Sequence, residues 1–571
     1  MSMKKIYLLL TILTYALAPV SCSLEEVAFK PDEHDVTDAY TAESLLLGIY
    51  SKLGTDGIYR QNLPFIFNLP NDESKTSGET LTAQRTESSN AFTASSSYVQ
   101  ATWKALYDAV YSANYFLDLM EKKMPGFTQK DQQQCEYYVA EAKALRALLY
   151  FELVRWFGNV PLVLSPQESY KKAEEFSQAA PADVYIQIEK DLKEAAGVLT
   201  YYNEDNVRKD NSFRISKGGV LGLLTKVYVT WAGYPLKDES KWELAALTAQ
   251  ELIDEGPHGL LGDYEQLWHN SGSNTWDPKE SLLELSYWSP LSTTESCGRV
   301  GMTNGVRATQ GGLRGGNHTH SVFYNFHPTF LTKWPDYEND LRFGLTYADY
   351  SYTKEGRKAI TKKKVDGVSN TDITFLMAWQ WKDTHKDWKA NWRFESCYLL
   401  TNRKWDTEIY VPDYNNQVNS NYSNVNWYLL RYADVLLLYA EALNEWKKAP
   451  TAEAFNAVNM VRRRGFGLGV NTPSELADLP SDLDYVKFQQ AIRDERAWEL
   501  AAEGHRRQDL VRWGIYYEAV MDTYDGLKDW YENAQRYFIG GEYTQKDKHE
   551  LLPIPQREID LCGYKQNKGW Y

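Results

Sequence analysis

Apolar residues recur at intervals of three and four along much of the chain, the spacing of one buried face of an α-helix. Ala142, Leu145, Leu149 and Leu153 show this spacing clearly. It predicts five early helices, over residues 37–54, 98–124, 133–157, 182–199 and 216–232. The same spacing returns at Leu430 and continues to about residue 517.

Glycine and proline separate these helical segments. The breaks are Pro125-Gly126, Gly158 with Pro161, and Gly233 with Pro235. Amphipathic helices joined by such short turns pair into hairpins, and the hairpins stack. We find no strict sequence repeat of about 34 residues, so any tetratricopeptide-like (TPR-like) repeat is degenerate. The prediction is a mainly α-helical fold in which TPR-like hairpins support a loop-rich, partly β region.

That loop-rich region extends from residue 259 to 428. Glycine, asparagine and short alternating stretches replace the helical spacing there. Ten of the 19 tryptophans fall in these 170 of the 571 residues, well above their share. We therefore divide the chain into residues 22–258, 259–428 and 429–571, as parts of one structural unit.

The first 21 residues have the pattern of a secretory signal peptide. Lys4 and Lys5 precede an apolar run over residues 6–20, which is too short to span a bilayer comfortably. Small residues then lead to Cys22, at the point where cleavage is expected. A cysteine there accepts a diacylglyceryl group, and a multiply acylated N-terminus anchors stably to a membrane. The alternative is an ordinary signal peptide with a chance cysteine.

The charge balance of the mature chain is acidic. Removal of residues 1–21 takes away Lys4 and Lys5 and leaves 60 basic against 77 acidic residues, a net charge of −17. This balance argues against binding to nucleic acid and against electrostatic docking on an anionic membrane. The cysteines beyond Cys22 are too scattered for a disulfide framework or a CxxC metal site.

Three glutamates are candidates for acid–base catalysis. Glu495, Glu499 and Glu503 are spaced to share one helix face, and a helical glycoside hydrolase would need such paired carboxyls across a cleft. Arg496 and Arg506 lie beside them in the sequence. Neighbouring guanidinium groups lower carboxyl pKa values, which suits ion pairs and not a general acid. We therefore predict a structural role, no catalytic residue and no enzyme activity.

Two further motifs are weak. His318 and His320 form an HxH pair without further spaced ligands, so no metal site is predicted. The glycine-rich stretch 311–316 lacks the GK[ST] of a phosphate loop and opens no helix. No cofactor is expected.

Several blocks together resemble the SusD/RagB family of surface lipoproteins, in order and over nearly the whole chain. They are ALRALLY (144–150) with WFGNVPL (156–162), RISK (214–217), LRYADVLLLYAEA (430–442), ERAWELAAEGHR (495–506) with DLVRWG (509–514), LPIP (552–555) and the terminal QNKGWY (566–571).

The resemblance implies a lipoprotein on the outer face of the outer membrane. It implies a SusC-like TonB-dependent transporter as partner, and an oligosaccharide as ligand. Capture of peptides is the alternative within the family. A helical glycoside hydrolase and a purely structural or adhesive lipoprotein are the alternatives outside it.

Sugar recognition uses flat aromatic faces together with planar polar groups. The tryptophan-rich region supplies both, and the resemblance implies that N-terminal loops contribute as well. The predicted ligand residues are Asp72, Arg85, Trp276, Trp288 and Trp334. Most of the other tryptophans are expected in the core, because tryptophan is highly buried on average.

Overall fold

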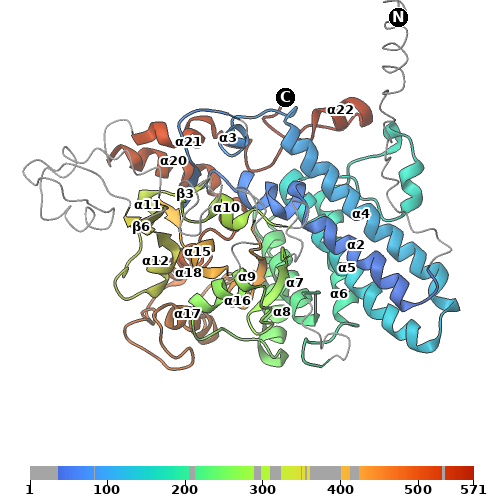
Figure 1. Cartoon of the computed structure of the whole chain (residues 1–571), viewed down its shortest axis with the longest axis horizontal. Helices are drawn as coiled ribbons and strands as arrows, with labels where there is room; N and C mark the ends of the chain where they lie inside the picture. Colours follow the sequence, from blue (N-terminus) through green and yellow to red (C-terminus); the bar gives the residue numbers. More distant parts are fainter. Residues whose placement is uncertain are drawn as a thin grey trace, which may run out of the picture.

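A computed structural model describes residues 36–529 and 534–571, except 83, 205–212, 289–296, 309–322, 349, 354–355, 360–399 and 412–422. Helices dominate these residues, and strands are few and short (Figure 1). The predicted mainly α-helical fold is confirmed. Residues 1–21, Cys22, the 311–316 stretch and the histidine pair at 318 and 320 lie outside the described residues.

All five early helices are present within a few residues of their predicted bounds. They are α2 (Ala39–Leu53), α4 (Ser97–Lys123), α5 (Gln129–Phe157), α6 (Pro181–Ala196) and α7 (Lys217–Ala232). Local chemistry sets their ends. The Ser96 and Thr128 hydroxyls accept hydrogen bonds from backbone N–H groups in the first turns of α4 and α5. At the other end of α5, Gly158 takes φ +69°, which a residue with a side chain rarely adopts.

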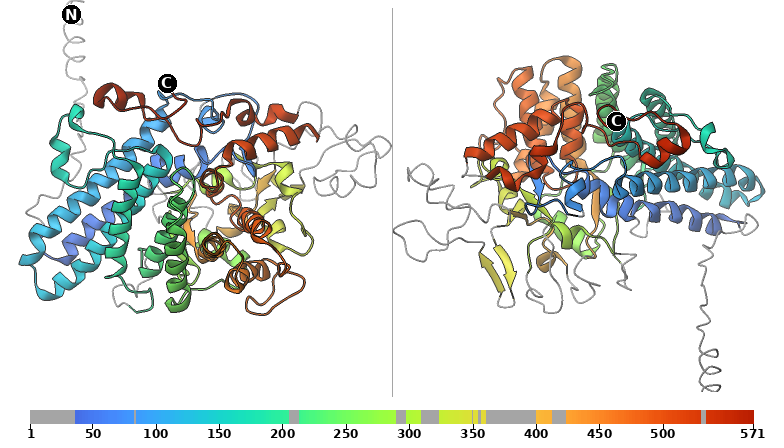
Figure 2. Two further views of the ribbon diagram at one scale, coloured as in Figure 1. Left: turned by 180° about the vertical axis from the view of Figure 1, so that it is seen from behind. Right: turned by 90° about the horizontal axis from the view of Figure 1, so that it is seen from above.

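Successive helices pack against one another as expected for stacked hairpins. The contacts follow the chain from α4 to α5, α6 and α7, and then to α8 (Lys241–Glu255). Helix α16 (Tyr432–Lys447) then packs on both α7 and α8. The C-terminal helices thereby continue the stack that the N-terminal helices begin (Figure 2).

The helical spacing that returns at Leu430 predicts a helix start two residues before the observed one. Leu430 and Arg431 belong to strand β8 (Trp427–Arg431), and α16 starts at Tyr432. The remaining C-terminal helices are α17 (Ala452–Gly465), α18 (Tyr485–Glu499), α19 (Arg506–Arg512), α20 (Tyr516–Gly526), α21 (Ile539–Tyr543) and α22 (Gln556–Cys562).

The middle region combines short strands with short helices. Among the described residues, two-stranded antiparallel sheets pair β2 (Ser281–Leu285) with β8, β4 (Tyr347–Ala348) with β7 (Thr401–Asn402), and β5 (Tyr350–Thr353) with β6 (Gly356–Ala359). Strand β3 (Tyr324–Phe326) pairs with β1 (Ser74–Thr76) of the N-terminal part. The short helices described in this region are α9 (Glu265–Ser273), α10 (Val300–Asn304), α11 (Pro328–Leu331), α12 (Leu341–Thr346) and α15 (Thr407–Tyr410). Another short helix, α3 (Gln84–Glu87), belongs to the N-terminal part. The β5–β6 hairpin projects from the side opposite the C-terminal helices (Figure 2, right).

One large hydrophobic core includes residues from all three parts of the chain. In the part that the structure covers, no helix is both long and apolar enough to cross a bilayer.

Candidate functional site

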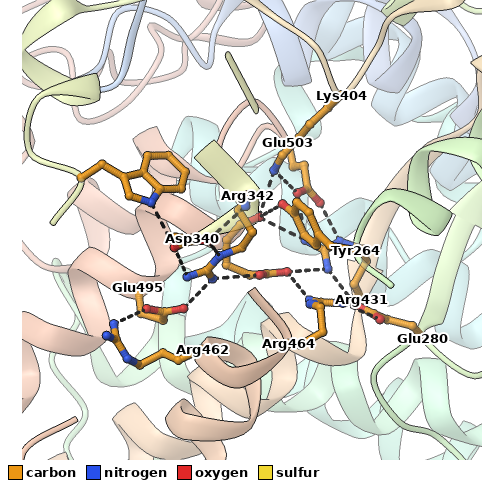
Figure 3. A network of polar contacts seen from close by, with 12 residues as sticks. Tyr264, Glu280, Asp340, Arg342, Lys404, Arg431, Arg462, Arg464, Glu495 and Glu503 are labelled. Atoms are coloured by element: carbon orange, nitrogen blue, oxygen red, sulfur yellow. Dashed lines mark hydrogen bonds and ion pairs between the residues drawn. The ribbon is translucent and has the colours of Figure 1, made fainter. Parts of the chain in front are cut away.

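The three glutamates singled out in the sequence belong to a buried network of carboxylates and guanidinium groups (Figure 3). Glu495 and Glu499 lie on α18. Glu503 does not share their helix face, because α18 ends at Glu499 and the chain turns before Glu503. The predicted single face is therefore wrong for Glu503, although its side chain does enter the network.

Glu499 is the centre of this network. Its carboxylate accepts hydrogen bonds from Arg464 at 2.6 Å, Arg431 at 2.9 Å and Arg342 at 3.1 Å. Burial raises the pKa of Glu499, but the three arginines outweigh burial and lower that pKa to about 2. The Glu499 carboxyl group is therefore ionised at neutral pH and is unsuited to donate a proton. The geometry therefore agrees with the predicted structural role.

The network joins elements that are far apart in the sequence. Arg342 comes from α12, Arg431 from β8 and Arg464 from α17. Glu280, directly before β2, accepts from Arg431 and Arg464, both at 2.9 Å. The charges thus connect the middle region to the C-terminal helices.

Trp334 is part of the core and not of a ligand surface. Its side chain is 2% exposed, its Nε1 donates to Asp340 at 3.0 Å, and its ring lies 5.4 Å from Phe343 and 6.1 Å from Trp498. The prediction that Trp334 contacts ligand is therefore wrong. The Pro335-Asp336 turn after it does not hold the ring outside, because α11, α12 and α18 enclose it.

The two polar candidates of the first loop already have partners within the protein. Asp72 accepts two hydrogen bonds from Arg506, both at 2.7 Å. Arg85 donates to the carbonyl of Ser77 and, at 3.2 Å, to the hydroxyl of Thr82. Both side chains therefore hold loops in place, and ligand contact by either remains a proposal.

Trp276 and Trp288 flank the same hydrogen-bonded turn. Ser286 donates to Asn274 at 2.7 Å, and Asn426 donates to the same oxygen at 3.0 Å. Trp276 is half-buried and lies 6.4 Å from Tyr202, ring centre to ring centre.

Trp288 is 50% exposed and is the only exposed tryptophan among the described residues. Strand alternation over residues 283–288 predicts an inward Tyr287 and an outward Trp288. It holds at this end of the segment, where Tyr287 is buried while Ser286 and Trp288 are exposed. It fails inside β2, because Glu284 is buried as well as the leucines.

An ionic cluster lies near Tyr287, the buried residue that precedes Trp288 in the chain. Asp56 accepts from Arg60 at 2.6 Å and from Arg299 at 2.7 Å. Gly54 and Gly298 both pack on the ring of Tyr287, the neighbour of Trp288, since a Cβ on Gly298 would lie 2.8 Å from that ring. The three loops that carry Asp56, Trp288 and Arg299 therefore meet. We call Trp288, Asp56, Arg60 and Arg299 the Trp288 surface.

This surface combines an exposed indole with planar carboxylate and guanidinium groups, the chemistry that suits sugar rings and hydroxyls. Sequence reasoning found Trp288 but missed its charged neighbours. Asp56 and Arg299 are 243 positions apart and belong to no motif, so no sequence signal indicates that they pair.

The five candidates do not form one site. Asp72 lines a cleft beside Trp498, whose ring packs on Trp334. Trp276 and Trp288 belong to the other group, near the turn at Asn274.

The described residues contain no group of three His, Cys, Asp or Glu side chains placed to hold a metal ion.

Comparisons with known proteins cover both halves of the chain. Residues 259–570 match the family model described as "SusD family", and residues 30–229 match the one described as "Starch-binding associating with outer membrane". Among curated proteins, the chain is 26% identical to SusD-like protein P25 of Formosa agariphila, over 81% of this chain and 77% of that protein.

Solved structures share the fold over nearly the full length. A SusD homolog from Bacteroides thetaiotaomicron is 45% identical, with a TM-score of 0.87 over 94% of this chain and 98% of that one. A laminarin-binding SusD-like protein is 24% identical, with a TM-score of 0.65 over 93% and 99%. Surface glycan-binding protein A from B. thetaiotaomicron, in complex with laminarihexaose, is 19% identical, with a TM-score of 0.66 over 92% and 99%.

Proposed function

Because the chain belongs to the SusD/RagB family, we propose that it is a lipid-anchored outer-membrane protein that binds oligosaccharides on the cell surface. We further propose that it delivers them to a SusC-like TonB-dependent transporter. The description of the family matched by residues 30–229 supports the association with the outer membrane. The glycan ligands named for two proteins of the same fold support the ligand class.

The observation that carries the proposal is the Trp288 surface. The Trp288 indole is 50% exposed, so a ligand that covers it would remove apolar surface from water, and the segments that carry Asp56 and Arg299 pack on the preceding residue, Tyr287. A sugar ring offers an apolar C–H face for the indole and hydroxyls for the charged groups. This surface therefore suits a carbohydrate better than a purely apolar ligand.

We propose that the protein binds without hydrolysing its ligand. The paired carboxylates Glu495 and Glu499 are both 0% exposed and are bound to arginines, so a glycosidic bond has no access to them. A glycoside hydrolase needs two carboxyl groups on either side of its substrate, one of them protonated.

Affinity electrophoresis of the mature protein in gels that contain single polysaccharides, laminarin among them, tests the proposal. We expect retarded migration in at least one gel and no released sugar on prolonged incubation. Release of reducing sugar would favour a hydrolase. Migration unchanged in every gel, with binding to a peptide library instead, would favour peptide capture.

A further inference from the structure

Helix α18 carries polar and aromatic side chains on the face opposite Glu495 and Glu499. Gln490, Arg493, Asp494, Ala497 and Trp498 follow the spacing of one helix face. They line a cleft of about 550 Å³, with residues of α19 and α20 on its other wall and Phe330 of α11 at its edge. Sites for small ligands typically have volumes of about 300 to 1,000 Å³.

The Arg493 guanidinium lies in this cleft without a direct ion-pair partner among the described residues. Its Nε is buried without a hydrogen-bond partner, and its guanidinium forms no ion pair with any residue whose position is described. The group lies 5.1 Å from the ring of Trp513. Burial lowers the pKa of Arg493, which is the sign of a cation that its surroundings do not fully compensate. Neighbouring Arg506 differs, because Asp72 neutralises it.

Acceptors and an aromatic face stand beside this donor. The Asp494 carboxylate is half-buried and accepts one hydrogen bond, from Gln490 at 2.8 Å. Trp498 is partly exposed, and the buried ring of Trp334 lies 6.1 Å behind it at an angle of 30°. A ring backed in this way is held in one orientation, which reduces the entropy lost when a ligand stacks on it.

We propose that this cleft is a second saccharide-binding site, in which Trp498 stacks on a neutral sugar ring while Arg493, Asp494 and Gln490 bind its hydroxyls. A hydroxyl both donates and accepts, so it satisfies a guanidinium and a carboxylate together. Charges of both signs line the cleft, Lys333 and Asp522 among them, so a neutral ligand with hydroxyls fits it better than a charged one. The inference rests on the proposed function for its ligand class and adds a site distinct from the Trp288 surface.

Fluorine NMR on the mature protein, with fluorinated tryptophan incorporated, tests this site. The Trp498→Phe and Trp288→Phe variants identify the two resonances. Glucose, galactose, mannose and xylose serve as probes, with triglycine as the peptide probe. We expect at least one sugar to shift the Trp498 resonance saturably.

Matched variants show whether the cleft residues cause the shift. In Arg493→Met and Asp494→Ala, the sugar affinity read from Trp498 should fall by about tenfold or more. Asp525→Asn, an exposed control on α20, should leave it unchanged. A Trp498 shift that is the same in all three variants would overturn the site, because the sugar would then bind elsewhere.

The remaining outcomes separate this inference from the proposed function. Absence of a Trp498 shift with every sugar overturns the second site, whether or not Trp288 responds. A Trp498 response to triglycine alone also overturns it. A lack of any Trp288 response to the polysaccharides, by contrast, counts against the Trp288 surface.

Discussion

At the scale of single residues, exposure separates tryptophans that the sequence treats alike. Trp288 and Trp334 both stand in loop-like segments before a proline or a serine-proline pair. One is 50% exposed and the other 2%. The same substitution should therefore have opposite consequences at the two positions.

Trp288→Ala should weaken oligosaccharide binding and leave folding intact. Loss of a stacking ring costs roughly 1 to 3 kcal/mol, about a tenfold to hundredfold change in Kd. Calorimetric titration with a polysaccharide retained in the gels measures this change. Tyr40→Ala removes another exposed ring, on α2, and should bind as the wild type does. Equal affinity of Trp288→Ala and wild type would place the ligand elsewhere.

Trp334→Ala should destabilise the protein. Removing a buried tryptophan leaves a cavity and costs about 3 to 5 kcal/mol. It also leaves the Asp340 oxygen without its indole donor. Chemical denaturation measures the loss, and a free energy of unfolding close to that of the wild type would contradict the burial of this ring.

Glu499→Gln should also lower the free energy of unfolding, by about 3 to 5 kcal/mol, because three buried arginines lose their shared counter-charge. The folded fraction should bind ligand as before. Glu243→Gln, at an exposed glutamate of α8, should change stability by less than about 0.5 kcal/mol. Intact stability combined with loss of glycan turnover would instead favour an enzyme.

The pH dependence of Glu499 has a definite sign. Its pKa is about 2 in the folded protein, against an ordinary value of 4.5. The unfolded chain therefore binds the proton more readily, and the stabilisation is complete above pH 4.5 and is lost as pH falls toward 2. Denaturation curves across this window should show a steeper loss in the wild type than in Glu499→Gln.

At the scale of elements, helix α7 approaches the backbone of strand β2 closely. A Cβ on Gly219 would lie 2.6 Å from the backbone oxygen of Leu282, and one on Gly222 would lie 2.7 Å from Leu430. These glycines therefore allow the helix to approach both strands of the β2–β8 pair. The approach is a backbone contact, so a side chain at Gly219 cannot simply rotate away.

Gly219→Ala should accordingly destabilise by about 1 to 3 kcal/mol, because the strand or the helix must move. Gly48→Ala in α2 is the matched control. A Cβ there meets nothing within 4 Å, so alanine should stabilise the helix by roughly 0.5 to 1 kcal/mol. Relative to the wild type, the free energies of unfolding of the two variants should shift in opposite directions when measured by thermal or denaturant unfolding. A shared direction would contradict the packing of α7 on β2.

At the scale of the whole molecule, the proposed function requires the folded body to stay at the membrane. The described residues begin at Val36, and the proposed anchor is Cys22. With a net charge of −17 after removal of residues 1–21, the body has no electrostatic attraction to an anionic surface. Attachment would therefore depend on the lipid.

Cys22→Ala should release soluble protein or leave uncleaved precursor. Fractionation of cells, followed by detergent extraction, distinguishes the two. A variant that is still processed normally and still partitions with the detergent phase would contradict the lipid anchor.

The five early helices and their order followed from the sequence by itself. Apolar residues at helical spacing and Gly158 at a helix end are local signals, because each depends on residues only a few positions away. The family blocks were equally readable. The helical signal was misleading at Leu430 and Arg431, where pairing with β2 overrides the local preference.

The candidate site depended on the tertiary structure. Sequence spacing placed Glu495 and Glu499 on one face, but their partners Arg342 and Arg431 come from other elements. Likewise, only packing decided that Trp334 is enclosed, that Trp288 is exposed, and that Asp56 meets Arg299. The physical reason is that local periodicity determines which face of a helix is apolar, whereas exposure and long-range ion pairs depend on which faces finally come together.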